Sequence, residues 1–181
     1  YLLATEQHYD LSSIGEIQRN MFRYHEGLTA RHPYESSWWT WPLDIRPIYY
    51  YQATRLPEGM GGVISSFGNP IVWWTGLAST VALIVRGVRR RHFDKPSLFL
   101  LIAFAAQFLP WSFITRATFI YHYFASVPFI LLSTGYLFKL WIARWPKAQY
   151  IAGGIAVAAL LVFALYYPAI SGLPVSRAYL D

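Results

Sequence analysis

The stretch NPIVWWTGLASTVALIV, residues 69–85, decides the fold. It is continuously apolar and not alternating, which is typical of a membrane helix. At about 1.5 Å per residue it extends roughly 25 Å, close to the thickness of the hydrocarbon core of a bilayer. Runs of this kind recur, and the sequence predicts four transmembrane helices at about residues 69–86, 96–114, 119–141 and 150–167.

These runs predict an all-α integral membrane protein. Only helices or closed barrels satisfy their backbone polar groups in lipid, and the runs do not alternate as barrel strands would. Pro110 and Pro128 fall inside two of the runs and are expected to kink them.

The composition agrees and excludes several chemistries. Of the 181 residues, 55% are hydrophobic and only 13% are charged, whereas soluble domains carry about a quarter charged residues. Cysteine is absent, which rules out disulfides, thiolate metal sites and a cysteine nucleophile. His8 and His25 have no further ligand at a suitable spacing. We therefore expect neither a metal nor a cofactor.

The charges between the runs predict the orientation. The first connection carries five basic residues and one acid, and the third carries three basic residues and no acid. By the positive-inside rule both face the cytoplasm. Residues 1–68, with five arginines and seven acids, and the C-terminus then lie on the extracytoplasmic side of the cell membrane. Because topology accounts for the pI near 9.6, we expect no nucleic-acid partner.

Residues 1–68 are predicted to form an extracytoplasmic or interfacial segment. A helix at about residues 13–28 begins with a capping box of Ser13 and Glu16, and its apolar stripe comprises Ile14, Ile17, Met21, Tyr24 and Leu28. Such a helix either lies flat in the membrane interface or packs on a soluble domain. The chain begins with Tyr1 and has no signal-peptide pattern. We expect a fragment whose missing N-terminal half carries the first spans.

An aromatic loop follows at residues 31–51, with three tryptophans and four tyrosines. Such rings gather at membrane interfaces because one end of each is apolar and the other is wet. Interface anchoring does not require the ionisable residues between them, so the loop is also a candidate substrate-facing surface. Its candidate residues are Arg31, His32, Glu35, Trp38 and Arg46. Residues 56–68 are predicted to be a Gly-rich loop without the phosphate-binding Gly-x-x-x-x-Gly-Lys pattern.

The stretch FITRATFIYHYFASVPF, residues 113–129, places ionisable groups at the non-cytoplasmic edge of the second and third runs. Such groups are costly near membrane depth and mark candidate sites. Arg116, Tyr121 and His122 are candidate ligands of a lipid phosphate, which the planar guanidinium would hold. If the third helix begins by Arg116, Phe119 and Tyr123 share its face. The alternative is a snorkelling arginine and an interfacial histidine.

Three motifs resemble the C-terminal region of the protein O-mannosyltransferases, especially the bacterial ones. They are YHEGLTARHPYESSWWTWPLDIRPIYYY, GNPIVWW and FITRATFIYHYFASVPF, and the resemblance covers about residues 13–141. It implies a C-type glycosyltransferase that moves mannose from a polyprenyl-phosphate donor to Ser or Thr of an acceptor protein, on the outer face of the bilayer. The family's acidic catalytic pair belongs to an N-terminal loop that this chain does not contain. The resemblance therefore implies no catalytic residue here and no activity of this chain alone.

Other functions remain open at this point. A related C-type glycosyltransferase could carry another sugar or use a lipid acceptor. A non-catalytic membrane anchor or assembly subunit would share the four helices, but it would leave the charged residues of the aromatic loop without a purpose. An Asp-Glu pair after an upstream membrane span would favour the mannosyltransferase, and an initiator Met just before Tyr1 would favour the anchor.

Overall fold

The computed structural model describes residues 11–27 and 31–180, and the chain divides into two compact units. The first comprises Tyr1–Pro33 with Thr115–Ala117, and the second comprises Tyr34–Ile114 with Thr118–Asp181. In the first unit, helix α1 spans Leu11–Glu26, and its apolar residues Ile14, Met21 and Tyr24 are exposed. Ser13 lies inside this helix, so the predicted capping box is wrong. Leu28, the last residue of the predicted stripe, lies outside the described residues.

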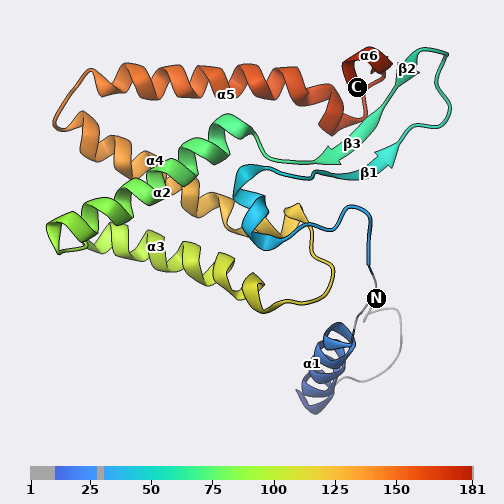
Figure 1. The fold of residues 1–181 in the computed structure, drawn as a ribbon, viewed down its shortest axis with the longest axis horizontal. Coiled ribbons are helices and arrows are strands. Elements are labelled where there is room, and N and C mark those ends of the chain that lie inside the picture. Colours follow the sequence, from blue (N-terminus) through green and yellow to red (C-terminus); the bar gives the residue numbers. More distant parts are fainter. Residues whose placement is uncertain (1–10, 28–30, 181) are drawn as a thin grey trace. The chain divides into compact units, whose positions relative to one another are not determined.

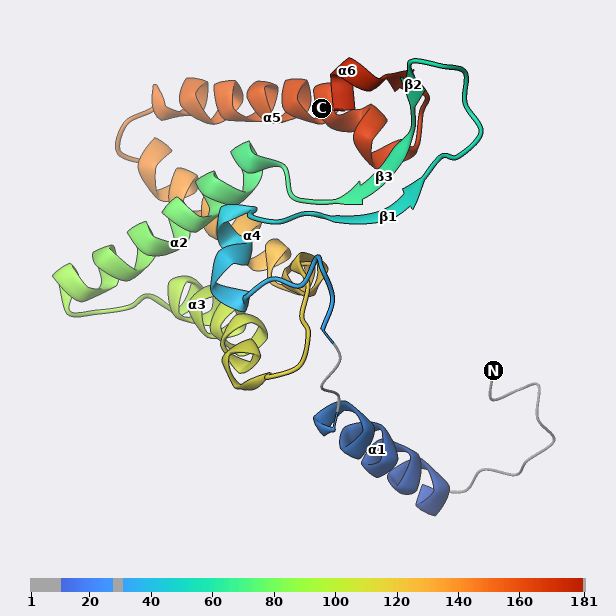
Figure 2. The same ribbon diagram turned by 45° about the vertical axis from the view of Figure 1, so that its right-hand side comes forward.

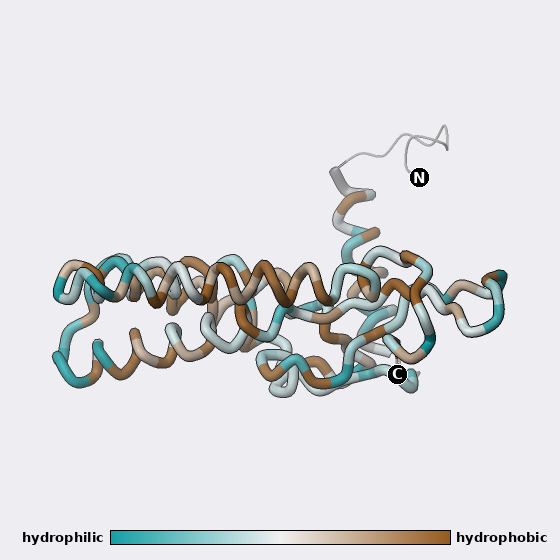
Figure 3. The backbone as a smooth tube through the Cα atoms, turned by 90° about the horizontal axis from the view of Figure 1, so that it is seen from above, coloured by the Kyte–Doolittle hydropathy of each residue, from teal (hydrophilic) through white to brown (hydrophobic). Residues whose placement is uncertain are grey.

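The second unit is built on four helices, α2 (Pro70–Arg90), α3 (Lys95–Phe108), α4 (Val127–Ile142) and α5 (Ala148–Ser171). Helix α2 packs most extensively on α4, and α4 also contacts α3 and α5. The α2–α3 and α4–α5 connections lie at one end of this bundle, at the left of Figures 1 and 2. Figure 3 shows hydrophilic residues gathered at that end and apolar residues along the helices.

Within the described part of the chain, three helical segments are long and apolar enough to cross a bilayer: Pro70–Arg90, Lys95–Phe113 and Ala148–Ser171. Helix α4 is equally apolar but has only 16 residues, about 24 Å of helix. Large apolar side chains of α5, such as Leu160 and Leu161, are 67% exposed, which suits a lipid environment and not water. The mainly helical membrane fold predicted from the sequence is confirmed.

The two prolines that the sequence predicts to kink transmembrane helices lie at helix boundaries instead. Helix α3 stops at Phe108, and Pro110 lies in the 3-10 helix η2 (Leu109–Phe113). Pro128 lies in the first turn of α4, where its missing N–H costs nothing. The third apolar run is therefore not one helix from residue 119, because a 3-10 helix, η3 (Ile120–Ala125), precedes α4.

Helices α2 and α4 pack closely at Gly76. A Cβ atom added to Gly76 would lie 2.9 Å from side-chain carbons of Ile130. Ser133 of α4 and Ser79 and Thr80 of α2 are also buried. Small residues at such contacts let two membrane helices approach closely, and van der Waals packing then stabilises the pair.

Short strands occupy the other end of the bundle. Strand β1 (Ile48–Gln52) pairs with β3 (Val63–Ser66) in antiparallel register, with a bulge between Tyr49 and Tyr51. Strand β2 (Met60–Gly61) pairs with β4 (Val175–Ser176), and helix α6 (Arg177–Leu180) follows. The prediction of a loop over residues 56–68 is thus wrong, because backbone pairing to partners distant in sequence orders half of it as strand.

Candidate functional site

The two units divide the residues that the sequence singles out. The first unit contains Arg31, His32 and Arg116, and the second contains Glu35, Trp38, Arg46, Tyr121 and His122. Arg116 lies in a bend outside any helix. Because α4 begins only at Val127, the helical face that would join Arg116 to Phe119 and Tyr123 does not form.

His122 is the centre of an aromatic cluster in the second unit. Its ring stacks on Trp41 with a centroid distance of 5.8 Å and lies 4.3 Å from the ring of Trp111 and 4.4 Å from that of Tyr121. These rings come from η1 (Trp38–Leu43), η2 and η3, and η1 is far from the other two in the sequence. We call these four residues the His122 cluster.

The backbone orients the imidazole of His122. Its Nδ1 lies 3.1 Å from the amide nitrogen of Phe119 and 2.9 Å from the carbonyl oxygen of the same residue. The tautomer that accepts the Phe119 N–H at Nδ1 carries its proton on Nε2, which then acts as a donor. The ring is thus held in one orientation by both stacking and backbone contact.

Two buried polar links fix the cluster's framework. Trp41 is completely buried, and its Nε1 donates a 2.9 Å hydrogen bond to Oγ of Ser36. Ser36 and Thr118 are joined twice, since the Ser36 N–H donates to the Thr118 carbonyl at 2.8 Å and the Thr118 hydroxyl donates to the Ser36 carbonyl at 2.9 Å. Satisfied buried hydrogen bonds of this kind make one arrangement unique. They hold the part of the aromatic loop after Tyr34 to the segment that leads into η3.

The other predicted residues of this unit have structural contacts. Trp38 packs edge-to-face on Phe108 at 5.1 Å. A terminal nitrogen of Arg46 donates a 3.1 Å hydrogen bond to the backbone carbonyl of Glu35 and not to its carboxylate. The Arg46 contact closes the aromatic segment on itself.

Asp44 is a residue that sequence reasoning passed over as a site candidate. It follows η1 with φ 58°, in the left-handed region that Asp tolerates. Burial raises the pKa of its carboxyl to about 6, although the hydrogen bond from the Gly68 N–H lowers it. No sequence pattern announces such burial, because it comes from packing between segments 24 residues apart.

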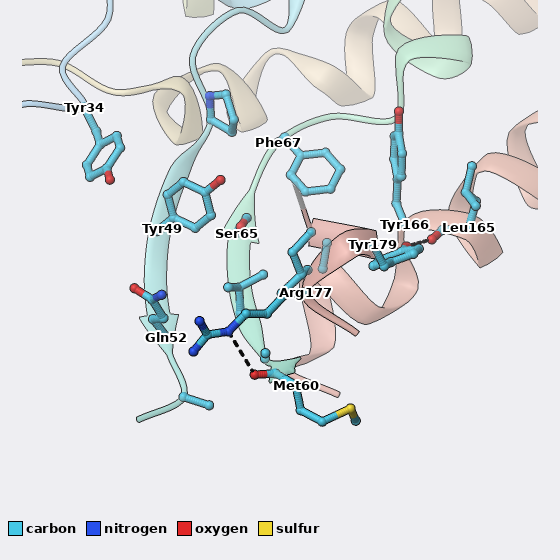
Figure 4. Close-up of a pocket in the computed structure, with 17 residues that line it drawn as sticks. Tyr34, Tyr49, Gln52, Met60, Ser65, Phe67, Leu165, Tyr166, Arg177 and Tyr179 are labelled. Carbon is cyan, nitrogen blue, oxygen red and sulfur yellow. Dashed lines mark hydrogen bonds between the residues drawn. The ribbon is translucent and has the colours of Figure 1, made fainter. Parts of the chain in front are cut away.

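Two hollows lie at the strand end of the bundle. A cavity of about 780 Å³ is bordered by β1, β3, the end of α5 and α6 (Figure 4). A smaller recess of about 390 Å³ is almost entirely apolar and includes Trp73 of α2, Phe124 of η3 and Leu131 of α4. Within residues 11–27 and 31–180, no three His, Asp or Glu side chains gather as a metal site would require.

Comparison with known proteins identifies the family that has this architecture. Residues 11–180 match the family described as the C-terminal four-transmembrane region of protein O-mannosyltransferase. Polyprenol-phosphate-mannose–protein mannosyltransferases of Mycolicibacterium smegmatis and Mycobacterium tuberculosis are 27% and 29% identical to the chain over 92% and 91% of its length. The chain spans only about a third of those relatives, 35% and 34%.

A solved structure has the same fold. The Saccharomyces cerevisiae protein O-mannosyltransferase Pmt1–Pmt2 complex, bound to the sugar donor, superimposes with a TM-score of 0.74 at 20% identity. The match covers 93% of this chain and 25% of the yeast chain.

Proposed function

Because the chain belongs to the protein O-mannosyltransferase family, in the C-terminal four-transmembrane region, we propose that it is the C-terminal membrane portion of such an enzyme. The enzyme transfers mannose from a polyprenyl-phosphate donor to Ser or Thr of an acceptor protein. Its catalytic acids belong to the N-terminal half, so residues 1–181 alone are inactive. The observation that carries the proposal is the His122 cluster at the bundle end opposite the basic connections.

The orientation follows from charge. The basic connections share one end of the bundle, and the strands, η1 and η3 share the other (Figure 1). Positive charge is retained on the cytoplasmic side. We therefore assign residues 1–68 and the C-terminus to the extracytoplasmic side, where a lipid-linked donor would meet a translocating acceptor.

The donor has a lipid tail, a phosphate and a sugar, and the second unit offers groups that suit the tail and the phosphate. The apolar recess beside Trp73 and Leu131 suits part of an isoprenoid tail. Tyr121 and His122 can donate hydrogen bonds to phosphate oxygens. Arg116 belongs to the other unit and is a separate candidate for the cation that pairs with the phosphate. When the glycosidic bond breaks, charge grows on the phosphate, so donors placed there stabilise the transition state more than the ground state.

Glu35, Trp38 and Arg46 of the aromatic loop belong to the second unit, and we assign them to the side of the bilayer that meets substrate. Arg31 and His32 belong to the first unit, and we assign them to the same side of the bilayer separately. The deprotonation of the acceptor hydroxyl requires a general base. The family resemblance implies that this base belongs to the N-terminal half. We therefore assign the binding of the donor to the C-terminal half, which residues 1–181 form.

His122→Phe in the full-length enzyme tests the assignment. Phenylalanine retains a ring that can stack on Trp41 and Trp111 but removes both nitrogens. We expect transfer from polyprenyl-phosphate mannose to a Ser/Thr peptide to fall by about tenfold or more, the effect of losing one charge-assisted hydrogen bond. His92→Ala is the matched control, because His92 is exposed in the basic connection.

Two results would contradict the proposal. If the wild-type enzyme transfers no mannose from this donor, the assigned reaction is wrong. If His122→Phe and His92→Ala both retain wild-type rates at equal expression, the His122 cluster does not hold the donor phosphate.

A further inference from the structure

The cavity of about 780 Å³ is separate from the His122 cluster, and strand β1 divides the two. Tyr50 of this strand contacts Tyr121 of the cluster at a centroid distance of 6.2 Å. Tyr49 and Gln52 of the same strand line the cavity (Figure 4). The bulge between Tyr49 and Tyr51 changes the strand's register here. One short strand thus presents side chains to both places.

Glycines allow the C-terminal segment to close this cavity. A Cβ atom on Gly61 would lie 2.8 Å from a side-chain carbon of Leu180, and one on Gly62 would lie 3.0 Å from the carbonyl oxygen of Gly172. A larger residue at Gly61 would force the Leu180 side chain to move, and one at Gly62 would press on the backbone that follows α5. The Gly-rich stretch is therefore required for packing and builds one wall of the cavity.

Arg177 is fixed at the cavity's edge by backbone groups. Its backbone N–H donates a 2.9 Å hydrogen bond to the Gly59 carbonyl, and its side-chain Nε donates to the Met60 carbonyl at 3.4 Å. Figure 4 shows the guanidinium between Gln52 and Met60. Both contacts leave the terminal nitrogens of the guanidinium out of the anchoring, and the residue lines the cavity.

The lining combines rings with neutral or cationic hydrogen-bonding groups. Tyr34, Tyr49, Tyr179 and Phe67 supply rings, and Gln52 and Arg177 supply an amide and a guanidinium. Among residues 11–27 and 31–180, no acidic residue lines the cavity. Tyrosines give large contact areas at low entropy cost, and such donors suit ligands rich in carbonyl oxygen. An extended polypeptide has this chemistry, with one carbonyl per residue.

We propose that this cavity binds a segment of the acceptor polypeptide that flanks the residue receiving the sugar. The inference rests on the proposed function, which requires a polypeptide on this side of the bilayer. The volume lies within the usual range for binding cavities, about 300–1,000 Å³, and the site stands apart from the cluster assigned to the donor.

The test compares long and short acceptors in the full-length enzyme. A peptide of fifteen residues with one central Thr reaches a flanking site, whereas a tripeptide with the same Thr does not. For Arg177→Ala and for Gln52→Ala, we expect the ratio of kcat/KM for the long peptide to that for the tripeptide to fall about five- to tenfold, the loss expected for one or two hydrogen bonds. Arg55→Ala is the matched control, because Arg55 is exposed nearby and does not line the cavity.

A photo-crosslinking residue gives a second readout that does not depend on turnover. Placed at Gln52 it should capture the long peptide, and placed at Arg55 it should not. An unchanged selectivity ratio in Arg177→Ala, or equal capture at both positions, would overturn the inference. A rise in KM for the lipid donor instead would assign the cavity to the donor and also overturn it.

The two proposals can fail separately. If the wild-type enzyme transfers mannose to both peptides and the variants keep the wild-type ratio, only the cavity assignment is wrong. If the wild-type enzyme transfers mannose to neither peptide, the proposed function itself fails.

Discussion

The backbone N–H of Gly68 donates a 2.8 Å hydrogen bond to Oδ1 of Asp44, and this contact joins the end of η1 to the start of α2. The carboxyl lies in a half-buried position, and burial raises its pKa from 3.8 to about 6. The folded protein therefore binds a proton at Asp44 at a pH where the unfolded chain has already released it.

The sign of the resulting pH dependence follows from that difference. Between about pH 4 and 6 the folded state binds more protons at Asp44, so stability from this group falls as the pH rises. Asp44→Asn keeps the acceptor for Gly68 and is neutral at every pH. We expect the melting temperature of the variant minus that of the wild type to rise between pH 4 and 6. Above about pH 7 this difference should stay constant. Thermal unfolding in detergent measures it, and a pH-independent difference would refute it.

Gly76→Ala should weaken the contact between α2 and α4. The added Cβ atom would lie 2.9 Å from Ile130, and overpacking of this kind costs about 1–3 kcal/mol. Gly153→Ala in α5 is the control, because nothing lies within 4 Å of its added Cβ atom and alanine favours a helix. Unfolding in detergent should show loss in the first variant and none in the second. Equal free energies of unfolding for the two variants would mean that the contact between α2 and α4 accommodates the added methyl group without a loss of stability.

Arg116→Ala should lower donor-dependent transfer by the full-length enzyme by roughly 10²-fold, if a charge-assisted contact of about 3 kcal/mol is lost. Arg116→Lys should restore only part of this, because an ammonium cannot reproduce the planar fork of the guanidinium. Expression and membrane insertion report on folding. Near wild-type turnover of Arg116→Ala would show that the guanidinium only reaches toward the interface.

Single cysteines test the orientation in a cysteine-free background. Glu58 is exposed between β1 and β2, and Arg90 is exposed at the end of α2. A membrane-impermeant maleimide added outside intact cells should label Glu58→Cys, whereas Arg90→Cys should react only after the membrane is opened. Ser65 is a poor labelling position because its side chain is buried. Labelling of both positions from outside would contradict the assignment.

The apolar runs by themselves determined the membrane class and the helical fold, and three sequence motifs carried the family resemblance. These features are local, because the length and charge of one segment depend on no other segment. The same local reasoning misplaced the start of the third helix, since a proline within a run can lie in the first turn of a helix as well as at a kink.

Only the tertiary structure decided how the site is built. The His122 cluster needs Trp41 and Trp111 from distant segments, and its framework depends on a link between Ser36 and Thr118, 82 residues apart. The burial that raises the pKa of Asp44 and the cavity that Arg177 lines also arise from contacts between distant segments. Such contacts depend on which surfaces pack together, and periodicity along one segment carries no information about its partner.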